Sequence, residues 1–203
     1  MSPGCPPAQV RLDLLITRTG HGGEVDLSGA NLTDANLTQA NLTAGDTVWY
    51  WGKGGDVDLS NADLNNANLE QASLTAGEAR SGDGGNVNFT GADLADANLE
   101  QASLTAGTSR VFGDGGDVDL SNADLNNANL EQAIFTAGDG DGGDGGDVDL
   151  SNADLNNANL GQASLTAGYG RHGGVGAILG IPPPPPSPPA ASPQLHPDVT
   201  HMR

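Results

Sequence analysis

Residues 55–69 read Gly-Asp-Val-Asp-Leu-Ser-Asn-Ala-Asp-Leu-Asn-Asn-Ala-Asn-Leu, and the same letters return at residues 116–130 and 146–160. Looser copies begin at Gly23 and Gly85. Within every copy a large apolar residue, usually leucine, recurs at each fifth position. Internal repetition of this kind indicates a repeat architecture, and the repeat therefore decides the fold.

A period of five residues fits neither common secondary structure. An α-helix repeats every 3.6 residues and a strand every 2, so leucines five apart would spread around a helix or alternate between the faces of a strand. The spacing does fit a chain that turns a corner after each short extended piece, with one large residue pointing inward on every side of a square coil. The residue two positions earlier also points inward, because side chains alternate along an extended chain. That residue is valine on the first side and alanine on the other three, as in Val57, Ala62, Ala67 and Ala72.

The Ala-Asp/Asn-Leu-x-x pattern between residues 24 and 168 resembles the pentapeptide-repeat family. The resemblance implies an all-β fold, a right-handed quadrilateral parallel β-helix of about five coils. It implies little about function, because one fold can serve many roles. We therefore expect an N-terminal segment over residues 1–23 that can act as a cap, the β-helix over residues 24–168, and a Gly/Pro-rich, largely disordered tail over residues 169–203.

The blocks do not follow one another directly. After each Thr-Ala-Gly comes a Gly- and Asp-rich stretch of about ten residues, which returns to the next block through Gly-Gly. Two further pentapeptides do not fit there, because the inward positions of one insert would be Ala79 and Gly84, which cannot fill a core. We interpret the inserts as loops that leave one corner of every coil, and loops on a rigid scaffold often carry function.

The first insert contains an aromatic trio, Trp49, Tyr50 and Trp51, with both tryptophans of the chain. Exposed aromatic side chains are typical of protein-binding hot spots. The alternative is that the trio folds back onto the edge of the rod. We take these three residues as candidates for binding a partner protein.

The chain of 203 residues carries 26 acidic and 7 basic residues, a formal charge of −19. All the acids except Asp13 and Asp198 lie between Glu24 and Asp154. Direct binding to nucleic-acid phosphates is therefore not expected, and proteins or cations are the electrostatically suitable partners. Stacking of the coils would place acidic columns on the first two sides of the rod: Asp26, Asp58, Asp119 and Asp149 on one, and Asp63, Asp93, Asp124 and Asp154 on the other.

Two functions compete with a plain solubility role for the acidic residues. The family resemblance implies the first, because some acidic pentapeptide-repeat rods mimic DNA in the DNA-binding groove of DNA gyrase. The second is calcium binding by the last insert, where Asp139, Asp141, Asp144 and Asp147 stand between glycines and offer the oxygen ligands that Ca²⁺ prefers. We expect a non-enzymatic structural or protein-interaction rod without a cofactor, with a gyrase-directed DNA mimic and a calcium-responsive repeat protein as alternatives.

Catalytic residue types are missing from the repeats. The four histidines, His21, His172, His196 and His201, and the single cysteine, Cys5, all lie outside the repeated body. Because no histidine or cysteine stands in the rod to act as a base, a nucleophile or a transition-metal ligand, we expect no enzymatic activity.

The ends of an open β-helix expose strand edges, which need covers. Residues 10–16 and 175–181 could cap the first and last coils or join two rods as a homodimer. Residues 182–189 are proline except for Ser187, which is typical of a polyproline II tract that other domains can bind. No segment approaches the roughly 18 apolar residues of a membrane span, and we expect a cytoplasmic protein without membrane contact.

Overall fold

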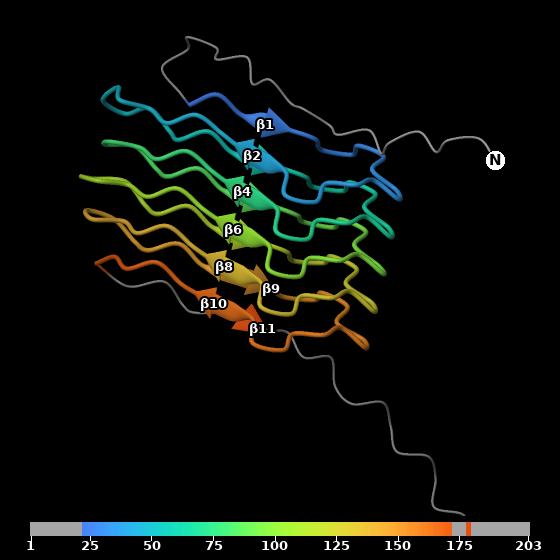
Figure 1. Ribbon diagram of the computed structural model, residues 1–203. Coiled ribbons are helices and arrows are strands. Elements are labelled where there is room, and N and C mark those ends of the chain that lie inside the picture. Colours follow the sequence, from blue (N-terminus) through green and yellow to red (C-terminus); the bar gives the residue numbers. More distant parts are fainter. Residues whose placement is uncertain (1–21, 172–177, 180–203) are drawn as a thin grey trace, which may run out of the picture.

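The structure, a computed structural model, describes residues 22–171 and 178–179. These residues form short strands and no helix, and the chain winds through five coils that stack into a rod (Figure 1). The predicted all-β solenoid is confirmed. The strands are β1 (Val25–Asp26), β2 (Asn41–Thr43), β3 (Val57–Asp58), β4 (Ser73–Thr75), β5 (Val87–Asn88), β6 (Ser103–Thr105), β7 (Val118–Asp119), β8 (Ile134–Thr136), β9 (Val148–Leu150), β10 (Ser164–Thr166) and β11 (Ile178–Leu179).

Two parallel sheets form the first and fourth sides of the rod. The first side has the strand order β1-β3-β5-β7-β9-β11, and the fourth side has the order β10-β8-β6-β4-β2. Each strand pairs with the equivalent residues of the next coil, as Val57 does with Val87 and Leu74 with Leu104. The second and third sides are held by single parallel bridges, such as Asp63 with Asp93. Columns in the repeated sequence are therefore columns in space.

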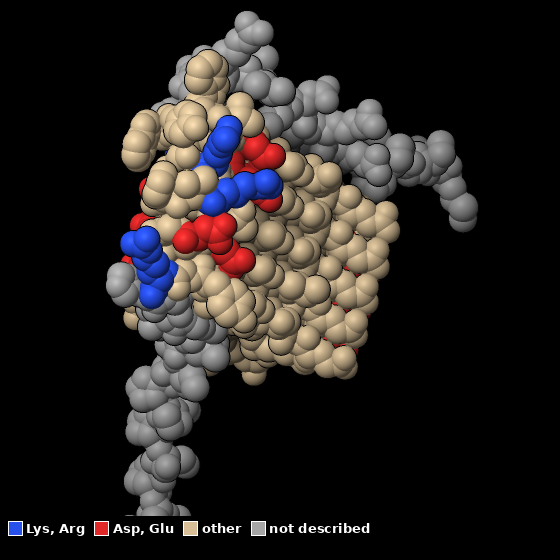
Figure 2. Space-filling view, turned by 90° about the vertical axis from the view of Figure 1, so that its left-hand side faces the viewer, with Lys and Arg blue, Asp and Glu red and all other residues tan. Residues whose placement is uncertain are grey.

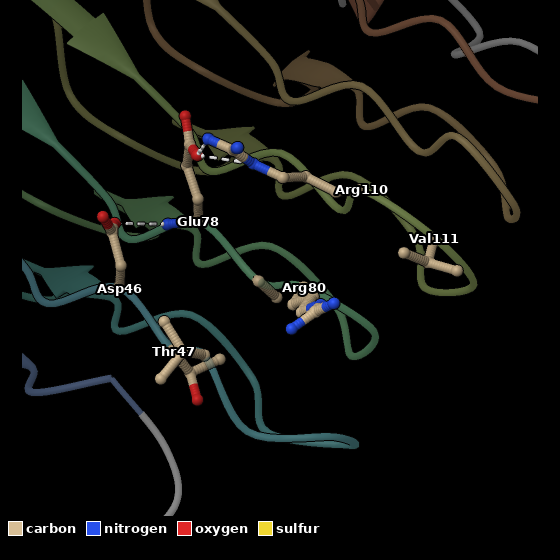
Figure 3. A pocket seen from close by; sticks show the side chains of 8 residues that line it. Asp46, Thr47, Glu78, Arg80, Arg110 and Val111 are labelled. Atoms are coloured by element: carbon tan, nitrogen blue, oxygen red, sulfur yellow. Dashed lines mark hydrogen bonds and ion pairs between the residues drawn. The ribbon is translucent and has the colours of Figure 1, made fainter.

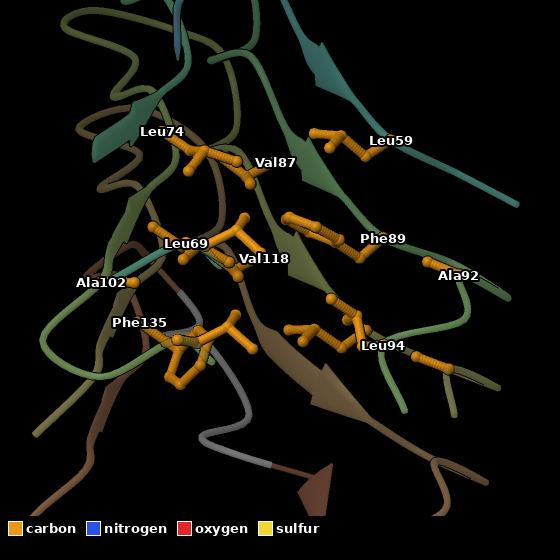
Figure 4. Close-up of a cluster of buried hydrophobic side chains, with 14 of the residues drawn as sticks. Leu59, Leu69, Leu74, Val87, Phe89, Ala92, Leu94, Ala102, Val118 and Phe135 are labelled. Atoms are coloured by element: carbon orange, nitrogen blue, oxygen red, sulfur yellow. The ribbon is translucent and has the colours of Figure 1, made fainter. Parts of the chain in front are cut away.

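The inward positions form one continuous apolar core along the rod (Figure 4). In the middle coils the inward leucines, phenylalanines and alanines are fully enclosed, for example Leu69, Phe89 and Ala102, each at most 1% exposed. Leu32 in the first coil and Leu155 in the last are only partly buried, because each has a neighbouring coil on one side alone among the described residues. The predicted alternation of large and small inward residues is confirmed.

Three corners of each coil are tight turns with the same backbone geometry. The amide of the inward alanine donates to the carbonyl of the preceding inward leucine, as from Ala72 to Leu69 at 2.9 Å. The residue before that alanine is left-handed, with φ of 56° at Gln71 and 62° at Gly29. Glycine and asparagine reach this conformation most easily. The last position of the Ala-Asp/Asn-Leu-x-x pattern is thus the turn residue.

The fourth corner opens into the inserts, whose two arms touch through glycine backbones. The glycine that begins each insert and the glycine that ends it alternate in one hydrogen-bonded column, with N···O distances of 2.7 to 2.9 Å. A Cβ atom on Gly107 would lie 1.8 Å from the carbonyl oxygen of Gly77, so only glycine allows this approach. The column, which we call the glycine neck, consists of Gly23, Gly45, Gly55, Gly77, Gly85, Gly107, Gly116, Gly138, Gly146 and Gly168.

Beyond the neck the inserts stack on one another and form a thin second lobe, the fin, made of residues 45–55, 77–85, 107–116, 138–146 and 168–171. Parallel bridges join Thr47 to Ala79, Ala79 to Ser109 and Ser109 to Gly140. The predicted position at one corner is confirmed, but the inserts are not separate loops. Small residues such as Ala79 and Ser109, each 1% exposed, suit a lobe whose two arms lie this close together.

Polar ladders accompany the core on the third side. The amide of Asn129 donates to Asn98 Oδ1 at 3.2 Å, and Asn159 donates to Asn129 Oδ1 at 3.1 Å. Gln39 donates to Gln71 Oε1 at 3.0 Å, so stacked side-chain amides bind their own kind from coil to coil.

The two rod ends differ in what the structure describes. β11 pairs with β9, matching Ile178 to Asp149 and Leu179 to Leu150, and so begins a sixth layer over the last coil. The predicted cap at residues 10–16 lies outside the described residues. Of the predicted cap at residues 175–181, only 178 and 179 are described, and of the tail only 169–171, 178 and 179. Homodimer formation through end caps stays a prediction.

Candidate binding surface

The aromatic trio projects from the tip of the first insert and does not fold back onto the rod. Trp49 and Tyr50 are each 68% exposed, and Trp51 is 76% exposed. The amide of Gly52 donates to the carbonyl of Trp49 at 3.4 Å, which makes the trio part of a tight turn. Three large aromatic side chains in solvent form an exposed apolar patch of the kind that marks interaction sites.

Trp51 has an unusual backbone conformation, with φ of 72°. Every other non-glycine residue with positive φ in the described part of the chain is Asp, Asn or Gln at a rod corner. A bulky residue in this region is strained, and such strain gathers at functional sites. The turn therefore holds a tryptophan where glycine would be more stable.

The second and third inserts extend the patch below the trio. The Arg80 guanidinium lies over the Tyr50 ring, 5.5 Å from its centroid, a distance suited to a cation–π contact. In the third insert Val111 and Phe112 are 38% and 64% exposed. Apart from Ile134 and Tyr169, all the large exposed apolar side chains of the described residues lie in the first and third inserts.

A hollow of about 320 Å³ opens between the first three inserts (Figure 3). The Glu78 carboxylate binds the Arg110 guanidinium, with Nε at 3.0 Å, and holds the pKa of Arg110 above its ordinary value. The Glu78 amide donates to Asp46 Oδ1 at 2.9 Å and links the first two inserts. The hollow is lined by Asp46, Thr47, Val48, Glu78, Ala79, Arg80, Arg110 and Val111.

The fin holds all the basic residues of the described part of the chain, together with seven acidic residues. The lysines and arginines of the described residues are Lys53, Arg80, Arg110 and Arg171, and all four stand in inserts. Figure 2 shows basic side chains gathered on this edge. The sequence pointed to the trio but not to Arg80, Arg110 and Val111, which come together only when inserts of unequal length stack.

The acidic columns have a local structural role in the turns of the rod, which the repeat pattern alone did not predict. In each one the Asp Oδ1 accepts the backbone amide two residues later, as Asp58 does from Ser60 at 2.8 Å and Asp124 does from Asn126 at 2.9 Å. In the first coil the Ser28 hydroxyl and the Ser28 amide both donate to Asp26 Oδ1, and these two hydrogen bonds lower the pKa of Asp26. These are Asx turns, which asparagine makes equally well.

The third side shows that the negative charge is separable from the turn. There the column is asparagine, and Asn98 Oδ1 accepts the amide of Glu100 at 3.1 Å in the same way. The fourth side, formed by β2, β4, β6, β8 and β10, carries no ionisable residue in its strands. The aspartate columns therefore lie on only two of the four sides, and the turns there do not need their negative charge.

A further polar column flanks the neck, with Asp56, Asn86, Asp117 and Asp147 in successive coils. Each of the first three side chains accepts the backbone amide of the next member, as Asn86 does from Asp117 at 2.9 Å and Asp117 does from Asp147 at 2.8 Å. Burial raises the pKa of Asp117 despite the bond from the Asp147 amide, and the nearby carboxylates of Asp147 and Asp119 raise it further. The charged form of Asp117 therefore opposes folding.

We expect Asp117→Asn to stabilise the protein at neutral pH, because Asn86 fills the same role one coil earlier. A raised folded-state pKa means that the folded state binds the proton more readily, so the stability contributed by this group is present at low pH and is lost as pH rises through the folded pKa. Removal of the charge should raise the free energy of unfolding by about 1 kcal/mol at pH 7, the size of one like-charge contact in water.

Urea unfolding at several pH values measures this effect, and the gain should shrink towards pH 3. The reverse change, Asn86→Asp, should lower stability at pH 7. Equal stability of Asp117→Asn and the wild type at pH 7 would contradict the expectation.

The candidate calcium residues do not converge. Asp139 Oδ1 accepts the amide of Tyr169 at 2.8 Å, and the amides of Asp144 and Asp147 donate to the preceding coil. Within residues 22–171 and 178–179, no three His, Cys, Asp or Glu side chains gather in a way that could hold a metal ion. Calcium binding by Asp139, Asp141, Asp144 and Asp147 stays a prediction, which a rise in melting temperature with Ca²⁺ would support.

A family model described as pentapeptide repeats matches the chain in eight copies over residues 23–46, 55–78, 85–106, 116–139 and 146–167. These segments make up more than half of the sequence and leave out much of the fin. The chain belongs to the pentapeptide-repeat family. No curated protein matches it at a significant level.

Several solved structures of pentapeptide-repeat proteins are similar to this member of the family. A protein from the thylakoid lumen of Arabidopsis thaliana is 20% identical with a TM-score of 0.29, and the match covers 68% of this chain and 63% of that one. HetL, involved in heterocyst differentiation regulation in the cyanobacterium Nostoc, is 20% identical with a TM-score of 0.26, covering 78% and 92%. QnrB1, a plasmid-mediated fluoroquinolone resistance protein, is 14% identical with a TM-score of 0.20, covering 71% and 84%.

Among residues 22–171 and 178–179 there is no helix that is long and apolar enough to cross a bilayer.

Proposed function

We propose that this pentapeptide-repeat protein is a non-enzymatic protein-interaction rod that contacts its partner through the tip of the fin. The observation that carries the proposal is the exposure of the whole aromatic trio at one tip, on a chain with only 3% aromatic residues. Tryptophan, tyrosine and arginine dominate binding hot spots, and Trp49, Tyr50, Trp51 and Arg80 bring them together here.

The backbone of the tip supports the same proposal. Trp51 occupies a left-handed position where glycine would cost less, and no burial on the rod compensates for the strain. Gly at such a position commonly stabilises a turn, whereas a large side chain there gives up stability. A partner that covers the tryptophan would recover the apolar contact that the free protein lacks.

Affinity capture with a tip variant, Trp49→Ala combined with Trp51→Gly, tests the proposal. The variant should melt at the wild-type temperature or above it, because Trp51→Gly relieves the left-handed conformation. Tyr169→Ala is the matched control, since Tyr169 is 81% exposed in another insert. The wild type and the control should capture the same proteins from a cell extract. The tip variant should capture at least tenfold less of them, which corresponds to a loss of about 1.4 kcal/mol in binding free energy. Identical recovery with all three proteins would contradict the proposal.

DNA mimicry is a second candidate, and the aspartate columns favour it. The turns on the second side need an Asx residue but not a charge, because asparagine makes the same turn on the third side. The carboxylates of that side therefore provide a row of negative charge, repeated at the spacing of about 4.8 Å between stacked strands, that the fold itself does not require.

A gyrase supercoiling assay separates this candidate from the first. A DNA mimic should change supercoiling when added in excess, and a variant with asparagine at all four second-side positions should keep the fold and lose the effect. Unchanged gyrase activity with a large excess of the wild-type protein would remove DNA mimicry and leave the fin-tip proposal intact. The four positions are Asp63, Asp93, Asp124 and Asp154.

A further inference from the structure

We infer that the aromatic tip binds the proline tract at residues 182–189 of a second copy of this chain. The inference rests on the proposed function, because it names the chemistry that the same tip recognises. Proline-rich segments dock on exposed aromatic side chains, since a polyproline II helix is already extended and loses little entropy on binding. The chain carries both partners of this interaction, an exposed aromatic trio and a tract that is proline except for Ser187.

The tip has the surface that such a ligand needs. The indole and phenol rings of Trp49, Tyr50 and Trp51 offer flat faces on which proline rings pack. Arg80 lies over the Tyr50 ring and helps to fix it, and the hollow beside it continues the surface between Val48 and Val111. Tyrosine hydroxyl and tryptophan N–H groups can donate to the backbone carbonyls that a polyproline II helix leaves free.

The position and direction of the last strand favour the tract of a second copy over that of the same chain. β11 is parallel to β9, which follows the neck glycine Gly146, so β11 itself points away from the fin. Five coil spacings of about 4.8 Å, about 24 Å in all, separate the level of Leu179 from that of the first insert, and the tip stands at the outer end of the fin, beyond the neck. Residues 180–189 span at most about 36 Å when fully extended, and less as polyproline II.

Electrostatics also favours this mode of contact between two copies. Each chain has a formal charge of −19, so rods that meet through their acidic sides repel one another. The tract contains no charged residue, and the fin, with seven acidic and four basic residues, is much less negative than the rest of the described rod, which holds the other acids and no base. Docking of a neutral tract on the fin tip joins two copies while their acidic sides stay apart.

Two complementary full-length variants test the inference by tryptophan fluorescence. The tip variant, Trp49→Ala with Trp51→Gly, lacks tryptophan but keeps the tract. The tract variant, with Pro183, Pro184 and Pro185 replaced by serine, keeps both tryptophans. Addition of the tip variant to the tract variant should shift the tryptophan emission to shorter wavelength in a saturable manner. Sedimentation of the mixture should show a complex that neither variant forms alone.

The control is a double variant that carries both sets of changes, which should cause no shift when added to the tract variant. An equal shift with the double variant, or none with the tip variant at any concentration, would overturn the inference. Contact within one chain does not depend on concentration. If the tryptophan emission of the wild type differed from that of the tract variant at every dilution, the tract would bind the tip of its own chain, and the assignment to a second copy would be overturned. If self-association fails while the tip variant still loses captured proteins, the proposed function stands without this inference.

Discussion

Gly107→Ala should destabilise the protein by at least about 3 kcal/mol, the upper end of the usual cost of overpacking. Its Cβ atom would lie 1.8 Å from the Gly77 carbonyl oxygen and 2.7 Å from the Gly85 nitrogen, and both are backbone atoms that cannot rotate away. Relief would require the two arms of the fin to separate and the neck hydrogen bonds on either side to break. For a chain of this size the melting temperature should fall by roughly 10 °C.

Gly161→Ala provides the matched control in the last coil. A Cβ atom there would meet the Asn159 side chain at 3.1 Å and the Glu131 side chain at 3.8 Å, and both can move. Glutamate stands at the equivalent corner position in the coil before, at Glu131. The control should change stability by no more than about 0.5 kcal/mol, as ordinary surface substitutions do. Thermal unfolding followed by circular dichroism compares the two, and a stable Gly107→Ala would contradict the glycine neck.

Leu99→Ala should cost about 2–5 kcal/mol in the free energy of unfolding, the usual range for an enclosed leucine. Leu99 is fully buried in the third coil, with a complete coil on either side, so the cavity cannot collapse without moving several coils. Each coil of a solenoid is held by its neighbours, and the loss at the centre weakens two interfaces at once.

Leu160→Ala, at the equivalent position of the last coil, is the matched control. Leu160 is only partly buried, so less apolar surface is lost from the core. Urea unfolding should show a cost at Leu160 that is less than half of that at Leu99. Equal costs at the two positions would show that the core does not depend on position along the rod.

Most of the rod could be predicted from the sequence, because particular side chains mark its inward positions. Leucine at every fifth position, with alanine two residues earlier, specifies an inward face for each side, and Leu69 and Ala67 lie as predicted. The left-handed turn position was hidden, because glutamine holds it at Gln71 and Gln101 and glutamine does not signal that conformation.

The fin was missed because backbone atoms hold it together. Ala79 and Gly84 are too small to fill an apolar core, and we therefore interpreted the inserts as loops. The neck is stabilised by close glycine contacts that leave no apolar signal in the sequence. The trio could be predicted as a candidate site from composition alone. Its basic and apolar surroundings, Arg80 and Val111 among them, depend on the stacking of inserts that differ in length.

The surface that carries the proposed function exists only if the inserts stack into the fin. Amide hydrogen exchange measured by NMR tests this directly, because buried backbone bonds exchange only when the structure opens. The neck amides of Gly77, Gly107 and Gly116 should be protected to the same degree as the β6 amides, while the amides of the tip around Trp51 should exchange faster. Exchange of the neck amides at the rate of an unfolded chain, beside protected β6 amides, would contradict the stacking of the inserts.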